Sequence, residues 1–197
     1  MGDFRKELVK YGKLIYAQDF VVGSGGNISV RVKDRIYIKA SRVSLENSQE
    51  TDYNEIDLRT GKAVCLKGPC SIEVPMHTAC YMARPHDIGA VVHTHPVYGT
   101  IAAMSLKKLG FISYELMFTL STEVPVMGYK EPGSRELADA VKKMIKKHNA
   151  ILLKNHGALI VGRDLKEAYE RAVALERACK IYVLSKLTGK LSLIRRP

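Results

Sequence analysis

The chain has 197 residues, of which 46% are hydrophobic and 26% are charged. This length favours one domain over residues 1–197, and this composition excludes intrinsic disorder and collagen-like structure. The 31 Lys and Arg against 20 Asp and Glu give a net charge of +11. A basic surface of this kind either is simply solvated or attracts an anionic partner.

The positive charge is scattered along the chain. There is no Arg-rich arm, no aromatic RNA-binding motif and no paired-cysteine zinc finger, so we expect no nucleic-acid partner. No run of about 20 apolar residues could cross a membrane, and the N-terminal sequence MGDFRKELVK has no apolar signal segment. We therefore expect a cytoplasmic protein with no membrane partner, and attraction of a phosphorylated substrate is one interpretation of the charge.

The first part of the chain predicts one helix followed by short strands and a second helix. Apolar residues at helical spacing indicate an amphipathic helix over 3–19. Residues 27–32 and 35–39 alternate between apolar and polar and predict a hairpin. Residues 51–66 predict two shorter strands around a turn, and residues 74–84 predict a helix.

The second part of the chain predicts buried strands and two capped helices. The apolar segments that indicate strands are 88–94, 124–127, 150–154 and 158–161. Ser134 predicts the cap of one helix. Asp164, with Glu167 three residues later, predicts a capping box for the last helix, which should stop near Gly189. Several strands are joined by turns too short for a crossover, so we expect an α/β fold of the α+β type, with a mainly antiparallel sheet covered by helices.

Four cysteines lie at positions 65, 70, 80 and 179, and none of them forms a CxxC pair. Without a signal peptide, reduced thiols are the default expectation. Cys80 and Cys179 lie in helical patterns and are predicted to be in the core.

Histidines provide the strongest functional signal. His93 and His95 are two apart in a predicted strand, so both imidazoles point to the same face and can reach one metal ion. Two histidines at a strand end near solvent are the alternative interpretation. His156 follows a neighbouring strand, and three protein ligands with an open position are typical of a catalytic zinc site. Glu73 is the candidate for the carboxylate that acid–base chemistry needs.

A glycine-rich segment over residues 23–27 is the second signal. Glycines allow backbone N–H groups to approach an anion closely, and Ser24, Asn27 and Ser41 add side-chain donors. A plain tight turn is the alternative. His77, one turn after Glu73 in the predicted helix, either supports the site or belongs to the core.

Four motifs occur in the order seen in the class II aldolase/adducin family, which the sequence resembles from about residue 4 to residue 188. They are GSGGNISVR (23–31), SIE (71–73) with His77 four positions on, AVVHTH (90–95) and KNHG (154–157). The resemblance implies a three-layer fold with helices on both faces of the sheet. It also implies a homotetramer with active sites at subunit interfaces.

The resemblance assigns roles to individual residues. It implies one zinc ion per chain, held by His93, His95, His156 and Glu73, with Glu73 also moving the proton. It implies that the substrate phosphate contacts residues that line one end of the site: Ser24, Gly26, Asn27, Ser41, Arg42 and Ser71. Tyr114 falls where the family has a tyrosine that assists at the aldehyde.

Within the family, the sequence is most similar to the aldolases that cleave ketose 1-phosphates such as L-fuculose 1-phosphate. The implied products are dihydroxyacetone phosphate and an aldehyde resembling lactaldehyde, formed through an enediolate. A dehydratase of methylthioribulose 1-phosphate, an epimerase of ribulose 5-phosphate and a non-catalytic adducin-like module are the alternatives. The sequence departs from the family at Arg42, where a glycine is usual, and at Ile72, where a serine is usual.

Overall fold

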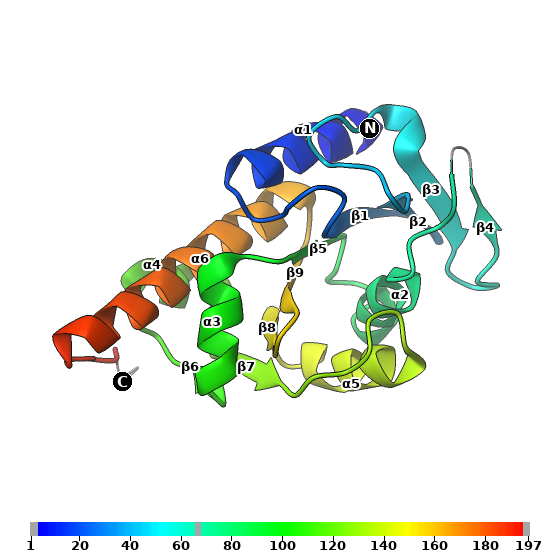
Figure 1. Ribbon diagram of the computed structural model, residues 1–197. Helices are drawn as coiled ribbons and strands as arrows, with labels where there is room; N and C mark the ends of the chain where they lie inside the picture. Colours follow the sequence, from blue (N-terminus) through cyan, green and yellow to red (C-terminus); the bar gives the residue numbers. More distant parts are fainter. Residues whose placement is uncertain (1–3, 66–67, 195–197) are drawn as a thin grey trace.

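A single sheet of nine strands forms the centre of the computed structural model, which describes residues 4–65 and 68–194 (Figure 1). The strand order is β4-β3-β2-β1-β5-β9-β8-β7-β6. The strands are β1 (Asn27–Val32), β2 (Arg35–Lys39), β3 (Tyr53–Asp57), β4 (Ala63–Val64), β5 (Ala90–Thr94), β6 (Lys108–Leu109), β7 (Val124–Met127), β8 (Ala150–Leu153) and β9 (Gly157–Gly162). Among these, only β7 and β8 pair in parallel, which confirms the mainly antiparallel sheet.

Helices cover both faces of the sheet and make the three expected layers. The α-helices are α1 (Phe4–Ala17), α2 (Val74–Ala83), α3 (Val97–Ser105), α4 (Tyr114–Leu120), α5 (Arg135–Ile145) and α6 (Leu165–Thr188). Two apolar cores result, one with side chains from α1, α3, α4 and α6 and the other with side chains from α2 and α5. Alternate residues of β5 enter opposite cores, Val92 the first and Val91 the second, as the two-residue period of a strand requires.

The predicted helix caps form as hydrogen bonds. The Ser134 hydroxyl accepts the Leu137 N–H at 3.1 Å, and the Asp164 carboxylate accepts the Glu167 N–H at 2.8 Å. The capping box itself is not closed, because the Glu167 carboxylate accepts the Arg163 N–H instead of that of Asp164. Helix α6 ends at Gly189, whose φ of +66° is favourable for glycine.

Helices α3 and α4 and the two-residue strand β6 do not follow from the sequence patterns. Helix α3 lacks a polar face that would reveal helical periodicity: Ala102 and Ala103 are buried, while Val97 and Met104 on its other side are exposed. The predicted start of the first helix at Asp3 lies outside the described residues. Within the described ranges, no helix is both long enough and apolar enough to cross a bilayer.

The expectation of four reduced thiols is wrong for Cys65 and Cys70, which form a disulfide. Gly68, which lies between the two cysteines in the sequence, has a φ of +77°, and the two Cα atoms are 6.2 Å apart. That separation lies within the range that a disulfide can bridge. Cys80 and Cys179 are free, buried thiols in the core, as predicted.

Candidate active site

His93 and His95 lie at the end of β5, a central strand of the sheet. His93 is buried and lies in register with Asn27 of β1 on one side and with Leu159 of β9 on the other. His95 comes just after the strand, where its backbone N–H donates to the Phe20 carbonyl at 2.8 Å. Both imidazoles are therefore attached to backbone that is hydrogen-bonded to neighbouring segments.

His156 reaches the same place from the tight turn between β8 and β9. Asn155 adopts a left-handed conformation, with φ of +56°, and the His156 N–H closes the turn on the Leu153 carbonyl at 3.1 Å. Gly157 follows because a Cβ atom there would collide with the Thr94 carbonyl oxygen of β5. The glycine lets the turn approach β5 closely, and this brings His156 to His93.

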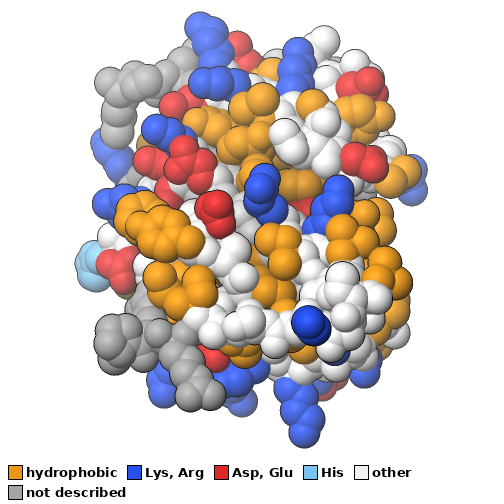
Figure 2. Space-filling model, turned by 90° about the vertical axis from the view of Figure 1, so that its left-hand side faces the viewer, with side chains coloured by type: hydrophobic (Ala, Val, Ile, Leu, Met, Phe, Trp, Pro, Cys, Tyr) orange, Lys and Arg blue, Asp and Glu red, His pale blue; other side chains and the backbone are white. Residues whose placement is uncertain are grey.

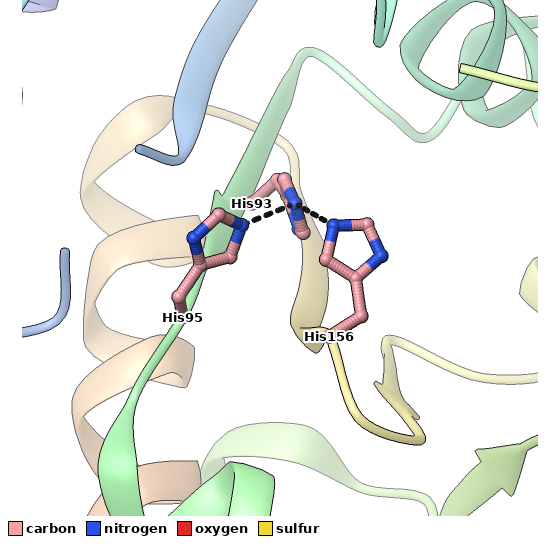
Figure 3. A group of neighbouring side chains, drawn as sticks. All are labelled: His93, His95 and His156. Atoms are coloured by element: carbon pink, nitrogen blue, oxygen red, sulfur yellow. Dashed lines mark hydrogen bonds between the residues drawn. The ribbon is translucent and has the colours of Figure 1, made fainter. Parts of the chain in front are cut away.

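The three imidazoles point toward one another (Figure 3). The His93 Nε2 atom lies 3.0 Å from His95 Nε2 and 3.2 Å from His156 Nε2. His93 Nδ1 is 2.9 Å from the Ala158 carbonyl oxygen, which can only accept, so Nδ1 carries the proton. In the neutral ring, Nε2 then presents a lone pair to the centre of the group.

Burial keeps the three rings neutral. Desolvation, followed by the neighbouring rings, lowers the pKa of His93 well below its usual value and lowers the pKa of His95 to about 4. Desolvation also lowers the pKa of His156. Neutral imidazoles with converging nitrogen atoms, all within 4.8 Å of one another, are the donor set that a borderline-soft divalent metal ion prefers.

Glu73 completes this end of the site from the start of α2. Its Oε1 atom lies 3.9 Å from His156 Nε2, and its buried Oε2 atom has no hydrogen-bond partner among the described residues. Desolvation raises the pKa of Glu73, partly offset by the Gly133 N–H that the carboxylate accepts. A buried carboxylate oxygen without a donor is costly, and a metal ion beside the imidazoles would satisfy it. The three imidazoles therefore fit a metal ion, and Glu73 lies beside them as the carboxylate.

The metal-site candidates open into a cavity of about 360 Å³ that also contains every residue expected at the anion. Those residues are Ser24, Gly26, Asn27, Ser41, Arg42 and Ser71. Gly26 has a φ of +62°, and a Cβ atom there would lie 2.8 Å from the His93 carbonyl oxygen, so the turn requires glycine. Arg42 also has a positive φ, +62°, which is unfavourable for a side chain other than glycine, Asn or Asp. The phosphate contacts themselves stay a prediction.

Lys39 lines the same cavity, and sequence reasoning missed it. Only 2% of its surface is exposed, and its Nζ atom donates to the carbonyls of Ser24 at 3.0 Å and Val43 at 2.7 Å. Desolvation lowers the pKa of Lys39 to about 8. In the sequence, Lys39 is marked only by its place at the end of an alternating strand, two residues before the candidate anion ligand Ser41. Its two carbonyl contacts join the glycine-rich turn to the segment that carries Arg42.

Tyr114 does not line this cavity. It begins α4, where its ring stacks on that of Phe118 with centroids 6.0 Å apart, and 64% of its surface is exposed. The structure thus brings the predicted metal and anion residues together within one chain and leaves Tyr114 outside.

We expect the metal-free protein to lose stability as the pH falls from 7 to 5. Burial holds the pKa of His77 near 3 and that of His95 near 4, whereas both titrate near 6.5 when unfolded. In this window the unfolded chain binds protons that the folded chain does not, so acid favours unfolding by up to about 1.4 kcal/mol per pH unit for each histidine. Urea unfolding followed at several pH values measures this slope.

The raised pKa of Glu73 acts in the opposite direction, because the folded state takes up that proton first. The net slope is therefore smaller than the sum over the histidines. The substitution His77→Asn should reduce the slope of unfolding free energy against pH by the contribution of one histidine. A free energy of unfolding that does not change between pH 7 and 5 would contradict this account.

Comparison with known proteins gives consistent results. The family described as "Class II Aldolase and Adducin N-terminal domain" matches residues 6–183. An L-fuculose phosphate aldolase of Methanocaldococcus jannaschii is 33% identical over 94% of this chain and 99% of its own length. A 5-deoxy-D-ribulose 1-phosphate aldolase of Bacillus thuringiensis is 30% identical over 96% of this chain and 89% of its own. A solved L-fuculose 1-phosphate aldolase superposes with a TM-score of 0.91 at 31% identity, covering 99% of this chain and 92% of that one.

Proposed function

The chain belongs to the class II aldolase and adducin family, and we propose from this premise that it cleaves a ketose 1-phosphate to dihydroxyacetone phosphate and an aldehyde, with zinc as its metal. The protein is a lyase of the aldolase type. One observation supports the proposal most strongly. A single cavity is lined by three neutral imidazoles, a carboxylate with an unsatisfied oxygen, a buried lysine and a glycine-rich turn.

The part of the cavity lined by Lys39 and the glycine-rich turn suits a phosphate group. The Lys39 ammonium has lost most of its hydration, and no carboxylate contributes to its pKa shift. A dianionic phosphate would supply the missing negative charge and would raise the pKa of Lys39 back toward its usual value. The exposed Arg42 and the N–H groups of the turn at Gly26 offer further donors. Binding the phosphate far from the reacting bond fixes the orientation of the substrate.

The part of the cavity lined by the imidazoles and Glu73 suits proton transfer beside a polarised ketone. When bound, zinc supplies Lewis-acid chemistry: it polarises the ketone oxygen and stabilises the negative charge that cleavage leaves on the dihydroxyacetone phosphate half. His93, His95 and His156 would hold it. Glu73 would give its proton to C3 as the C3–C4 bond breaks and the electron pair stays on C3, and would remove that proton in the reverse direction. In the metal-free protein, burial raises the pKa of this carboxyl toward the neutral range in which a general acid or base works best.

We propose a homotetramer with active sites between subunits, in which Tyr114 of a neighbouring subunit serves the aldehyde end. The C4 hydroxyl must lose its proton as the aldehyde forms, and because Glu73 is assigned to C3, this second proton transfer needs another group. The exposed Tyr114 and Phe118 offer an aromatic pair to another chain. Figure 2 shows several groups of apolar side chains on one face of the molecule, as a surface that meets a second copy requires.

The test of the function is synthesis in the reverse direction. Zinc-loaded protein is incubated with dihydroxyacetone phosphate and either lactaldehyde or acetaldehyde, and the products are identified by NMR. Lactaldehyde gives a six-carbon 1-phosphate of the fuculose type, and acetaldehyde gives a 5-deoxyketopentose 1-phosphate, the substrate class of the Bacillus relative. Failure to condense any aldehyde, and to exchange protons of dihydroxyacetone phosphate, would reject the proposal.

A separate prediction concerns Arg42. Replacement by glycine should raise the Michaelis constant for the phosphorylated substrate by about 10- to 100-fold, since loss of a charged hydrogen bond costs about 1.5–3 kcal/mol. The same change should stabilise the fold by about 1 kcal/mol, because glycine adopts the positive φ at this position without strain. Initial rates and thermal unfolding measure the two effects.

Lys33→Gly is the matched control. Lys33 also has a positive φ, +56°, but it lies in the turn between β1 and β2 and does not line the cavity. It should gain stability without a change in the Michaelis constant. An unchanged or lower constant for Arg42→Gly would mean that Arg42 does not hold the phosphate.

A further inference from the structure

We propose that His77 is a positioning residue for Glu73: a buried chain of side-chain hydrogen bonds from His77 through Ser29 to Tyr81 fixes helix α2 against strand β1. This inference rests on the proposed function, because it gives Glu73 the role of the proton carrier. None of His77, Ser29 and Tyr81 has a role in the proposed cleavage reaction itself.

The contacts are short and completely buried. The Ser29 hydroxyl lies 2.7 Å from His77 Nδ1 and 2.8 Å from the Tyr81 hydroxyl, and none of the three side chains is exposed to solvent. A fully buried imidazole that lacks an ionic partner is expensive to desolvate. The wider core contains apolar residues of similar size, which would avoid that cost. The buried side chains of His77, Ser29 and Tyr81 therefore have a role that apolar side chains could not fulfil.

A chain of hydrogen bonds fixes the orientation of the helix, which apolar contacts do not. Helix α2 otherwise packs on α5 and on the sheet through apolar side chains such as Met76 and Leu137. Apolar contacts are non-directional, and they leave small rotations and shifts of a helix nearly equal in energy. Hydrogen bonds lose strength steeply when distance and angle change. Two of them to one serine restrict the rotation of α2 about its own axis.

Rotation of α2 matters because Glu73 is its N-cap residue, directly before Val74. His77 is four residues later, so the two side chains share one face of the helix, and the His77 N–H donates to the Glu73 carbonyl at 3.1 Å. At the other end, Ser29 is two residues after Asn27, whose partner across the strands is His93. The chain of hydrogen bonds thus connects the helix that carries Glu73 to the strand beside the metal ligands.

An acid–base role for His77 is not needed. Burial lowers its pKa to about 3, so the ring stays neutral throughout the range in which a cytoplasmic enzyme would work. Its task is geometric, and a side chain with the same hydrogen-bonding atoms in the same place should be able to perform it. This property separates positioning from proton transfer by experiment.

The experiment compares three variants with a matched control. His77→Leu removes the partner of Ser29, Ser29→Ala removes the link, and His77→Asn keeps a donor and an acceptor near the position of Nδ1. Ser48→Ala is the control, since Ser48 forms an equally buried bond to the Tyr53 hydroxyl, at 3.0 Å, away from the cavity. This control measures how much stability is lost when a buried hydrogen bond between a serine and a tyrosine is removed.

We expect His77→Leu and Ser29→Ala to lower kcat for proton exchange on dihydroxyacetone phosphate by up to about 100-fold, the effect of a misplacement near 1 Å. The Michaelis constant should change less than about threefold, because the residues proposed to hold the phosphate are not substituted. His77→Asn should recover most of kcat, and Ser48→Ala should keep it. Equal loss in Ser48→Ala, or no recovery in His77→Asn, would overturn the inference.

Crystal structures of the metal-free variants test the positioning without activity. The Glu73 carboxylate should be displaced in His77→Leu and Ser29→Ala and should keep its place in Ser48→Ala. An undisplaced carboxylate in the first two would overturn the inference even if the proposed function holds. If wild-type protein exchanges no protons, the proposed function is wrong, and a displaced carboxylate would still support the positioning role.

Discussion

Glu73→Gln is expected to slow proton exchange on dihydroxyacetone phosphate by about 10²–10⁴-fold, the usual contribution of a positioned general acid or base. Glutamine keeps the shape of the side chain and one carbonyl oxygen near His156, where Glu73 Oε1 now lies at 3.9 Å. It cannot take up the proton. Exchange of the methylene protons into deuterated water, followed by NMR, measures the step directly.

The variant should keep its metal, although more weakly, because the three imidazoles remain. Glu46→Gln, at an exposed carboxyl that does not line the cavity, is the control and should leave exchange unchanged. The pH dependence adds a second readout: wild-type activity should fall at low pH as Glu73 becomes protonated. Exchange at the wild-type rate in Glu73→Gln would remove Glu73 from the mechanism.

His156→Ala is expected to abolish both metal binding and aldol cleavage. Wild-type protein should hold about one zinc ion per chain after dialysis, as a site with three imidazoles and one carboxylate predicts. Loss of an outer-shell partner alone weakens metal sites by about 10–100-fold, so loss of a ligand should exceed that range. Elemental analysis of the dialysed protein and competition with a chelator measure the change.

The fold should survive this substitution. His156 lies in a turn that lines the cavity and is only partly buried, so circular dichroism and thermal unfolding of the metal-free variant should match those of metal-free wild type. His86→Ala, at an exposed histidine, should bind zinc normally. Full retention of zinc in both His93→Ala and His156→Ala would show that the imidazole group is not the metal site.

Local patterns in the sequence determined much of the fold. The strands at 27–32 and 35–39 and the caps at Ser134 and Asp164 occur where they were predicted. These features depend on neighbours along the chain: alternation places side chains on two faces, and a cap satisfies an N–H group two or three residues away. The pairing of His93 with His95 is local in the same sense.

Distances between remote segments were decided only in three dimensions. The sequence suggested that His156 would join His93, but the separation of 3.2 Å follows from the pairing of β5 with β9 and from the close approach that Gly157 allows. Helix α3 escaped prediction because its exposed side is also apolar, so composition along the helix does not mark which side faces the core.

The burial of Lys39, the hydrogen bonds of His77 and the outward position of Tyr114 also came from the tertiary structure alone. A lysine at the end of a strand is expected at the surface. In the structure, Lys39 is buried because its ammonium group donates to the glycine-rich turn and to the segment that carries Arg42. The sequence by itself therefore determined which residue types could form a metal and anion site. The packing of distant segments determined which of them meet, because burial and long-range contacts are sums over parts of the chain that no local pattern contains.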